Sequence, residues 1–380
     1  MMEMRYVELN EICDVRDGTH DSPKYVQEGF PLVTSKNIID GKLDLSTVNY
    51  LTQKDYDKIN ERSKVDRGDI IMPMIGTIGN PLLIGDFYKF AIKNVALIKF
   101  PNKNISNRYI WYFLKSDAFN KYVAEKNRGG TQKFLSLNDI RRMKVPYISY
   151  FEQISVVEKL DMVYKVIMQR IKELQLLDDL IKARFVEMFG SIYDNKYGYN
   201  VMTLQDVCEP IKDGTHQTPT YTEDTVNGFK FLSSKDVTSG KVDWDHLKYI
   251  PEELHNELYK RISPRKGDIL LAKNGTTGVA AIVDRDEVFD IYVSLALLKP
   301  LEMVTAEYLC SAVNSLETKH QFDHSLKGIG VPNLHLGEIK KTKIIVPPIE
   351  LQKQFADFVH QVDKSKVVVQ KALDETQILF

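Results

Sequence analysis

Two stretches of the chain repeat apolar residues at helical spacing. Between Phe151 and Phe189 there is neither glycine nor proline. Apolar side chains alternate at steps of three and four residues, and Asp178 is the polar interruption. The series is Val157, Leu160, Tyr164, Ile167, Ile171, Leu174, Asp178, Ile181, Phe185, Met188. This spacing predicts one long helix over 151–190 with an a/d seam, roughly 57 Å in length and ended by Gly190.

A second seam closes the chain over 349–380, and it is shorter and more polar. Its members are Phe355, Phe358, Val362, Ser365, Val369, Ala372, Thr376 and Leu379. The pattern stops in mid-turn at Phe380, so we expect the last turns of this helix to be trimmed. Because a lone apolar stripe is costly to expose, the two helices are expected to pair. An antiparallel pair would place the two globular domains at opposite ends, related by a pseudo-two-fold axis.

Short apolar runs before each long helix predict strands. They are Arg5–Leu9, Phe30–Val33, Asp69–Met72 and Ala91–Phe100, then Val201–Leu204, Phe229–Leu232, Asp268–Ala272 and Ile291–Leu298. Helices are expected over 107–121 and 306–316. The predicted class is α+β: two similar domains, 1–150 and 191–348, separated by long helices over 151–190 and 349–380.

The two predicted domains share motifs in the same order. Asp17-Gly18-Thr19-His20 returns as Asp213-Gly214-Thr215-His216, and we expect a tight turn in which glycine supplies a positive φ. Four further pairs share a separation of 199 residues: Ser35-Lys36 with Ser234-Lys235, Gly41-Lys42 with Gly240-Lys241, Gly68-Asp69-Ile70 with Gly267-Asp268-Ile269, and Gly76-Thr77-Ile78-Gly79 with Gly275-Thr276-Thr277-Gly278. A period this long indicates a duplicated domain, because solenoid units are far shorter.

Composition places the chain among ordinary globular proteins. It has 380 residues, 43% of them hydrophobic and 27% charged, enough for two or three domains. No apolar run approaches the ~20 residues of a membrane span, and the N-terminus lacks a signal-peptide core, so we expect a cytoplasmic protein. Cys13 and Cys208 precede the two Asp-Gly turns, form no Cys-x-x-Cys pair, and are interpreted as buried apolar residues.

The net charge of −1 does not by itself indicate nucleic acid, but basic residues gather at equivalent places in both copies. A solvated surface and a DNA-binding surface both explain this excess. The first set is Lys121, Lys126, Arg128, Lys133, Arg141, Arg142 and Lys144, and the second is Lys319, Lys327, Lys340, Lys341 and Lys343.

The order of these elements resembles the specificity subunit of type I restriction-modification systems across essentially all of the chain. The resemblance rests on the paired Asp-Gly-Thr-His, Ser-Lys-Asn, Gly-Asp-Ile and Gly-Thr-x-Gly motifs. Each copy then ends in a Val-Pro junction that leads into a long helix. Copy two departs at Asp236, where the pattern has Asn, and at Gly328-Ile329-Gly330, which replaces Gly129-Gly130-Thr131.

The resemblance implies double-stranded DNA as the ligand and partners that carry the chemistry. Each domain would read one half of a split site, and the helix pair would space the halves. Two methyltransferase subunits would dock on the helices, and restriction subunits would join for cleavage. S-adenosylmethionine, ATP and Mg would then belong to those partners, and this chain would hold no cofactor.

Loop residues with hydrogen-bonding side chains are the candidate DNA contacts, since Arg and Lys suit phosphate or guanine and Asn and Gln suit adenine. In copy one they are Lys36, Asn37, Thr77, Asn80, Arg128, Thr131, Gln132 and Lys133. In copy two they are Lys235, Lys273, Asn274, Thr276, Thr277, Lys327, Asn333 and His335. For each one, a solvated loop or a local turn is the competing explanation.

No convincing catalytic set is present, and we expect a non-catalytic chain. Gly41-Lys42 and Gly240-Lys241 continue with Leu43 and Val242, which excludes a Walker nucleotide loop. His20 and His216 are interpreted as closing the Asp-Gly turn. Two alternatives stay open: a recognition portion of a fused restriction-methyltransferase, and a coiled-coil scaffold that binds protein. Because segments between the shared motifs differ widely, a DNA reader of this kind would have an asymmetric site.

Overall fold

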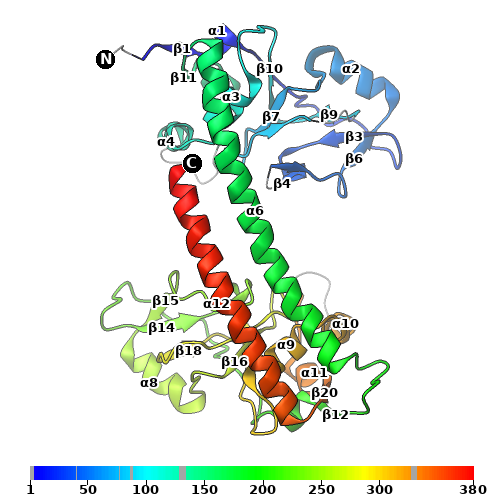
Figure 1. Ribbon diagram of the computed structural model, residues 1–380, viewed down its shortest axis with the longest axis vertical. Helices are drawn as coiled ribbons and strands as arrows, with labels where there is room; N and C mark the ends of the chain where they lie inside the picture. Colours follow the sequence, from blue (N-terminus) through cyan, green and yellow to red (C-terminus); the bar gives the residue numbers. More distant parts are fainter. Residues whose placement is uncertain (1–3, 40, 77, 86–88, 128–133, 327–331) are drawn as a thin grey trace. The chain divides into compact units, whose positions relative to one another are not determined.

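The computed structural model describes residues 4–39, 41–76, 78–85, 89–127, 134–326 and 332–380. The chain divides into two units, unit 1 with Met1–Ile167 and Ile378–Phe380, and unit 2 with Met168–Gln377. Figure 1 labels the elements along the chain.

Unit 1 contains short strands and helices followed by the first half of a long helix. Its elements are β1 (Tyr6–Glu8), α1 (Leu9–Ile12), β2 (Asp14–Asp17), β3 (Phe30–Val33), η1 (Ser35–Asn37), β4 (Ile38–Ile39), β5 (Lys42–Leu43), β6 (Asn49–Leu51), α2 (Gln53–Ser63), β7 (Ile70–Pro73), β8 (Leu82–Leu83), β9 (Ala91–Ile92), β10 (Val95–Lys99), α3 (Asn107–Phe113), α4 (Asp117–Lys126), α5 (Leu137–Arg142), β11 (Lys144–Pro146) and the start of α6 (Tyr150–Phe189).

Unit 2 repeats this order, except that its described residues 238–247 contain no strands corresponding to β4 and β5. Its elements are the end of α6, then β12 (Asn200–Thr203), α7 (Leu204–Val207), β13 (Lys212–Asp213), β14 (Phe229–Leu232), η2 (Ser234–Val237), β15 (Lys248–Ile250), α8 (Glu252–Arg261), β16 (Ile269–Ala272), β17 (Ala280–Ile282), β18 (Phe289–Ile291), β19 (Leu295–Leu298), α9 (Ala306–Val313), α10 (Leu316–Ser325), α11 (Leu336–Lys341), β20 (Lys343–Val346) and α12 (Ile349–Leu379).

The sheets of the two units have matching strand orders. An antiparallel sheet runs β2-β10-β7-β8 in unit 1 and β13-β19-β16-β17 in unit 2. A second sheet, β6-β3-β9 or β15-β14-β18, contains one parallel pair, β3 with β9 or β14 with β18. Residues of β7 and β16 are buried throughout, which explains why these segments are continuous apolar runs in the sequence. The predicted α+β class with twin domains is confirmed.

Two predicted strands are each broken into two. The run 91–100 forms β9 and β10 in different sheets, and the run 291–298 forms β18 and β19. In unit 1 the chain turns between them at Asn94, whose φ is 54°. The break could not be predicted from the apolar run, because the strands on both sides of the turn are buried and therefore apolar.

The predicted helix 107–121 is interrupted, and the predicted helix 306–316 ends a few residues early, at Val313. Ser116 caps α4 by accepting a hydrogen bond from the Phe119 N–H, and Ser315 caps α10 in the same way from the Thr318 N–H. A serine at this position satisfies a free N–H at a helix start. The predicted helix 107–121 is therefore two shorter helices, α3 and α4, joined at a capping serine, whereas the predicted helix 306–316 is essentially α9 and ends before the serine that caps α10.

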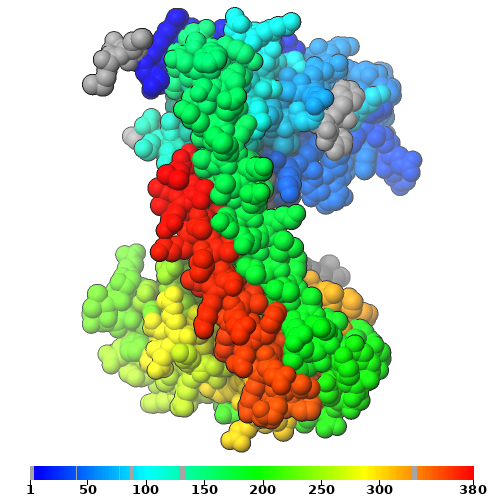
Figure 2. Space-filling model, in the orientation of Figure 1, coloured from blue at the N-terminus to red at the C-terminus, as the bar shows by residue number. Residues whose placement is uncertain are grey.

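In unit 2 the two long helices pair antiparallel (Figures 1 and 2), as their contacts show. Phe185 of α6 contacts Phe355 of α12 with ring centres 5.6 Å apart, while Asp178 pairs with Lys366 at 2.6 Å. Partner numbers thus rise along one helix as they fall along the other. The predicted pseudo-two-fold relation between the domains stays a prediction.

Candidate nucleic-acid interface

Each Asp-Gly turn lies directly against the backbone of a neighbouring strand. In unit 1 the Thr19 N–H donates to the Ile92 carbonyl at 2.9 Å. A Cβ on Gly18 would lie 2.3 Å from that oxygen, and one on Gly214 would lie 2.0 Å from the Ile291 oxygen. Neither glycine has a positive φ, so the expected reason for glycine was wrong. It is required because any side chain would collide with the adjacent strand.

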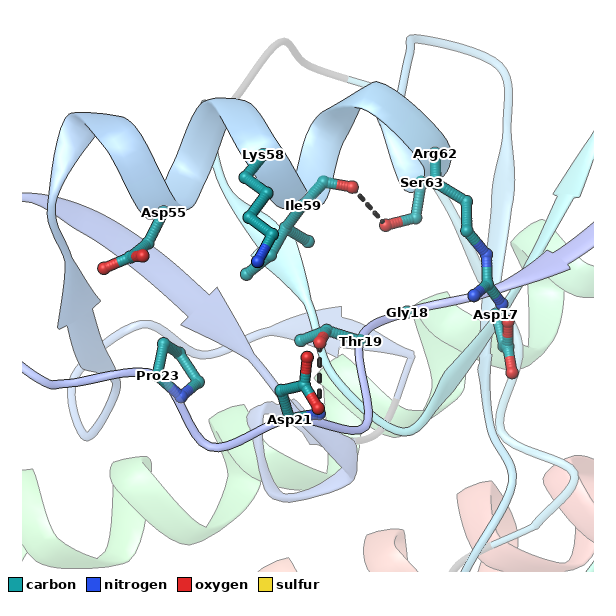
Figure 3. A pocket seen from close by; sticks show the side chains of 10 residues that line it. All are labelled: Asp17, Gly18, Thr19, Asp21, Pro23, Asp55, Lys58, Ile59, Arg62 and Ser63. Carbon is teal, nitrogen blue, oxygen red and sulfur yellow. Dashed lines mark hydrogen bonds and ion pairs between the residues drawn. The ribbon is translucent and has the colours of Figure 1, made fainter.

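In unit 1 the turn is organised around the buried carboxylate of Asp17 (Figure 3). His20 Nε2 lies 2.8 Å from Asp17 Oδ2, and Arg62 reaches down from α2 to pair with the other oxygen. The second His20 nitrogen, Nδ1, lies 2.8 Å from Asn94 Oδ1. The interpretation of His20 as closing the turn is therefore confirmed.

Unit 2 neutralises the matching Asp213 with a different cation. Lys273 Nζ lies 2.8 Å from Asp213 Oδ2, and His216 Nε2 lies 3.4 Å from Oδ1. Arg261, the repeat mate of Arg62, donates to the Asp213 and Gly214 carbonyls at 2.7 and 2.6 Å. The position of Lys273 is held in unit 1 by buried Met74, so only unit 2 has a lysine beside the carboxylate.

The Gly-Asp-Ile motif has a structural role in both units. Asp69 accepts a hydrogen bond from the Asp66 N–H at 2.8 Å and pairs with Lys99. Asp268 accepts from the Arg265 N–H at 2.8 Å and pairs with Lys299 at 2.7 Å. The motif closes a turn and ties it to the adjacent strand.

The structure separates the candidate DNA contacts of unit 1 into three groups. Lys36 is exposed on η1 and Asn80 is half-buried after the Gly-Thr-x-Gly loop. Asn37 is buried, with its Oδ1 accepting from the Thr34 N–H at 2.9 Å and its Nδ2 donating to the Asp44 carbonyl at 3.2 Å. Asn37 is thus a structural cap and its assignment to DNA is corrected. Outside the described residues lie Thr77, Arg128, Thr131, Gln132 and Lys133.

In unit 2 most described candidates are accessible and one is not. Lys273 is only 6% exposed and is engaged with Asp213, so its assignment as a DNA contact is also corrected. Lys327 lies outside the described residues. Exposed or half-buried on loops and caps are Lys235, Asn274, Thr276, Thr277, Asn333 and His335.

The structure brings two of the predicted loops together in unit 2. Asn274 and Asn333 form an isolated antiparallel bridge, and the Leu334 N–H donates to the Lys273 carbonyl at 2.8 Å. Within the described residues, the Oδ1 atoms of both asparagines are enclosed without a hydrogen-bond partner. Gly275 and Gly278 have φ of 75° and 82°, so these glycines shape the loop backbone.

A cavity of about 260 Å³ opens between α2 and the Asp-Gly turn of unit 1 (Figure 3). Lys58 points from α2 into the space above Thr19, and Asp55 and Pro23 lie at its far end. The lining carries carboxylates and cations together, so its charge favours neither an anion nor a cation. In the described part of the chain, no group of three His, Cys, Asp or Glu side chains is placed to hold a metal.

Some basic and thiol residues of the sequence serve the fold. Arg141 donates to the Val15 carbonyl at 2.8 and 3.0 Å, so its guanidinium is partly engaged within the fold although the residue is exposed. Cys13 and Cys208 lie in the hydrophobic cores, and burial raises the pKa of both thiols to about 12. Their interpretation as apolar residues is confirmed.

Sequence reasoning missed Arg62 and Arg261 as organisers of the Asp-Gly turns. Both share the 199-residue separation of the other paired motifs, which is the signal that identifies them. They were overlooked because no other motif residue lies beside them in the sequence. Among the described residues, no helix combines the length and apolar character that a membrane span requires.

Comparison with known proteins agrees with this duplicated architecture. The family model for the type I restriction modification DNA specificity domain matches residues 1–176 and again 196–376. The type I restriction enzyme MjaVIII specificity subunit of Methanocaldococcus jannaschii is 22% identical over 94% of this chain and 88% of its own length. The EcoBI specificity subunit of Escherichia coli is 26% identical over 37% of this chain and 29% of its own length.

A solved structure shares the fold over the whole chain. It is described as showing complex assembly and conformational transition of the type I restriction-modification system, and its matching chain is 20% identical with a TM-score of 0.53. The alignment covers 100% of this chain and 94% of that one. With two matches to one family model that together span most of its length, the chain belongs to the type I restriction-modification DNA specificity family.

Proposed function

We propose that this chain is the non-catalytic specificity subunit of a type I restriction-modification complex and reads an asymmetric, bipartite DNA site. DNA sequence recognition is the function of the family to which the chain belongs. The observation that carries the finer proposal is the duplicated turn, with one framework and different side chains. Asp17 with Arg62 in unit 1 and Asp213 with Lys273 in unit 2 hold the same fold, while the loops beside them differ. Two domains with different loop side chains are expected to recognise two different half-site sequences.

The long helices suit the docking of methyltransferase subunits. Apolar side chains remain exposed on them in unit 2, at Met168, Ile171, Leu176, Leu180 and Val186 of α6 and at Val367 and Val368 of α12. Large exposed apolar patches mark interaction surfaces, and we infer that these residues contribute to one. We place two methyltransferase subunits there, with restriction subunits joining them. S-adenosylmethionine, ATP and Mg would be bound by those partners, and the complex would act in the cytoplasm.

Duplex binding with the methyltransferase partner present tests this function. Affinity for the site found by methylome sequencing should fall steeply with salt, by about 10³ or more between 50 and 200 mM if six or more phosphates are contacted. Lys36→Ala and Lys235→Ala should each weaken binding and make it less salt-dependent, whereas the exposed Lys103→Ala serves as the matched control. Absence of duplex binding would favour a protein-binding scaffold, and methylation by this chain alone would indicate an enzyme.

A further inference from the structure

A glutamine near the start of each long helix is buried within its domain. Gln153 of α6 is 1% exposed and Gln352 of α12 is 0% exposed. The Ser106 N–H donates to Gln153 Oε1, and the Thr305 N–H donates to Gln352 Oε1, both at 2.9 Å. These donors are the residues that cap α3 and α9, so each glutamine ties its long helix to the start of one of these helices.

The amide nitrogens complete the connection. Gln153 Nε2 donates to the Ile148 carbonyl at 3.0 Å, in the segment between β11 and α6. Gln352 Nε2 donates to the Met303 and Pro347 carbonyls at 3.0 and 2.8 Å. Buried polar groups that are fully hydrogen-bonded hold one geometry, because any rearrangement leaves a group unpaired.

A second contact lies two turns further along each helix, and its acidic and basic partners are exchanged between the copies. In unit 1 Arg108 of α3 pairs with Asp161 of α6. In unit 2 Glu307 of α9 lies 3.0 Å from His360 of α12. These residues occupy matching positions with the acidic and basic residue types exchanged, so the contact is kept although the residues are not.

Two attachment points define a direction. The glutamine and the charged position are eight residues apart, or about 12 Å of helix. A helix held at both points cannot swing about either one. We propose that Gln153 and Gln352, with the pairs Arg108–Asp161 and Glu307–His360, are positioning residues that fix each long helix to its recognition domain. They thereby determine how strongly the complex discriminates between DNA sites whose half-sites are separated by different numbers of base pairs. This role rests on the proposed function.

The rigid attachment of each long helix to its recognition domain, called the joint below, is tested first without DNA. Spin labels at exposed positions 103 and 165, both in unit 1, report the angle between the domain and α6. Gln153→Met keeps the length of the side chain and removes its hydrogen bonds, and it should widen the distance distribution. The exposed Gln354→Met is the control and should leave it unchanged. An unchanged width of the distance distribution in folded Gln153→Met would refute the proposal that Gln153 fixes α6 to its domain.

Gap reading is then measured with methyltransferase subunits on duplexes whose half-sites are one or two base pairs closer or further apart. Gln153→Met and Gln352→Met should lose at least about tenfold of the discrimination between gap lengths, with the half-site bases unchanged. Arg108→Glu should reduce the discrimination between gap lengths in the same way. Arg108→Glu combined with Asp161→Arg should restore it, because the acidic residue then lies on α3 and the basic residue on α6, as on α9 and α12 in unit 2.

Unchanged gap discrimination in the folded variants would refute the positioning role and leave the proposed function intact. If the wild-type complex methylates no bipartite site, the proposed function fails, and the role in gap reading fails with it. The spin-label widths would still show whether the joint is rigid, so the two failures are distinguishable.

Discussion

At the scale of single residues, Asp17 and Asp213 occupy the same place in the two copies but are neutralised by different cations. Arg62 reaches the carboxylate in unit 1, while in unit 2 Lys273 does so and Arg261 turns to backbone carbonyls. A buried carboxylate requires a nearby cation, because an unpaired buried charge is strongly destabilising. Because Arg261 lies beside Asp213 without pairing with its carboxylate, we expect that Arg261 can neutralise Asp213 when Lys273 is removed.

Lys273→Met, which copies the residue of unit 1, should therefore destabilise unit 2 by only about 1–2 kcal/mol instead of the roughly 3–5 kcal/mol typical of a broken buried pair. Combining it with Arg261→Ala should cost at least about 0.5 kcal/mol more than the sum of the single changes. The chain has two tryptophans, so Trp244 fluorescence in a Trp111→Phe background reports urea unfolding of unit 2. Additive costs would argue against replacement by Arg261.

The same carboxylate predicts a pH dependence. Burial raises the pKa of Asp213, but Lys273, with a smaller contribution from His216, outweighs burial and holds that pKa below its ordinary value. A lowered folded-state pKa stabilises the fold above the ordinary pKa and ceases to do so as the pH falls through the folded value. The difference in unfolding free energy between wild type and Asp213→Asn should stay level from about pH 5 to 8 and shrink below about pH 4. A difference that grows toward acid would contradict this.

At the scale of elements, the two seams were predicted with different success. Asp178 interrupts the first seam because Lys366 of α12 lies against it, 2.6 Å away. In the second seam Lys366 and Leu373 are buried, while the predicted members Ser365 and Leu379 are exposed. A pattern that favours apolar residues misses a buried lysine, and its pairing with Asp178 is what allows the burial.

A heptad inserted after Leu174, with another after Val369, should keep the seam in register and lengthen the helix pair by about 10 Å. Under the proposed function, the unspecified gap should grow by roughly three base pairs at 3.4 Å each, with both half-sites unchanged. Methylome sequencing measures this directly. Altered half-site bases would show that the helices do more than space the domains.

At the scale of the whole molecule, duplication gives one framework twice with separate reading surfaces. The strand orders of the units match, and so do their Gly-Asp-Ile ion pairs. Their cores contain different residues, as in the buried pair of His255 and Asp290, 2.7 Å apart, where the mates in unit 1 are Tyr56 and Ala91. Each unit is thus stabilised separately.

Replacing residues 1–150 with the matching domain of another family member should therefore change one half-site and spare the other. The methylome of a host that expresses the exchanged chain with its methyltransferase partner provides the measurement. Changes in both half-sites would mean that the units do not read DNA independently.

The sequence by itself was sufficient to determine the duplication, the α+β class, the two long helices and the family. Heptad spacing, Asp-Gly turns and apolar runs are short-range or exactly repeated signals, and they can be read from neighbouring positions. The helix broken at Ser116 shows the limit of this reasoning, since the spacing of apolar residues does not reveal a cap within a helical pattern.

Only the tertiary structure decided which polar residues are free to bind a ligand. Lys273 and Asn37 were predicted to contact DNA, and both are instead engaged within the fold. Lys273 meets a carboxylate 60 residues away, and Arg62 meets one 45 residues away. Gln153 meets the Ser106 N–H across 47 residues. Such contacts depend on sheet register and helix docking, and residue type alone does not distinguish a buried lysine paired with a carboxylate from a lysine that faces solvent.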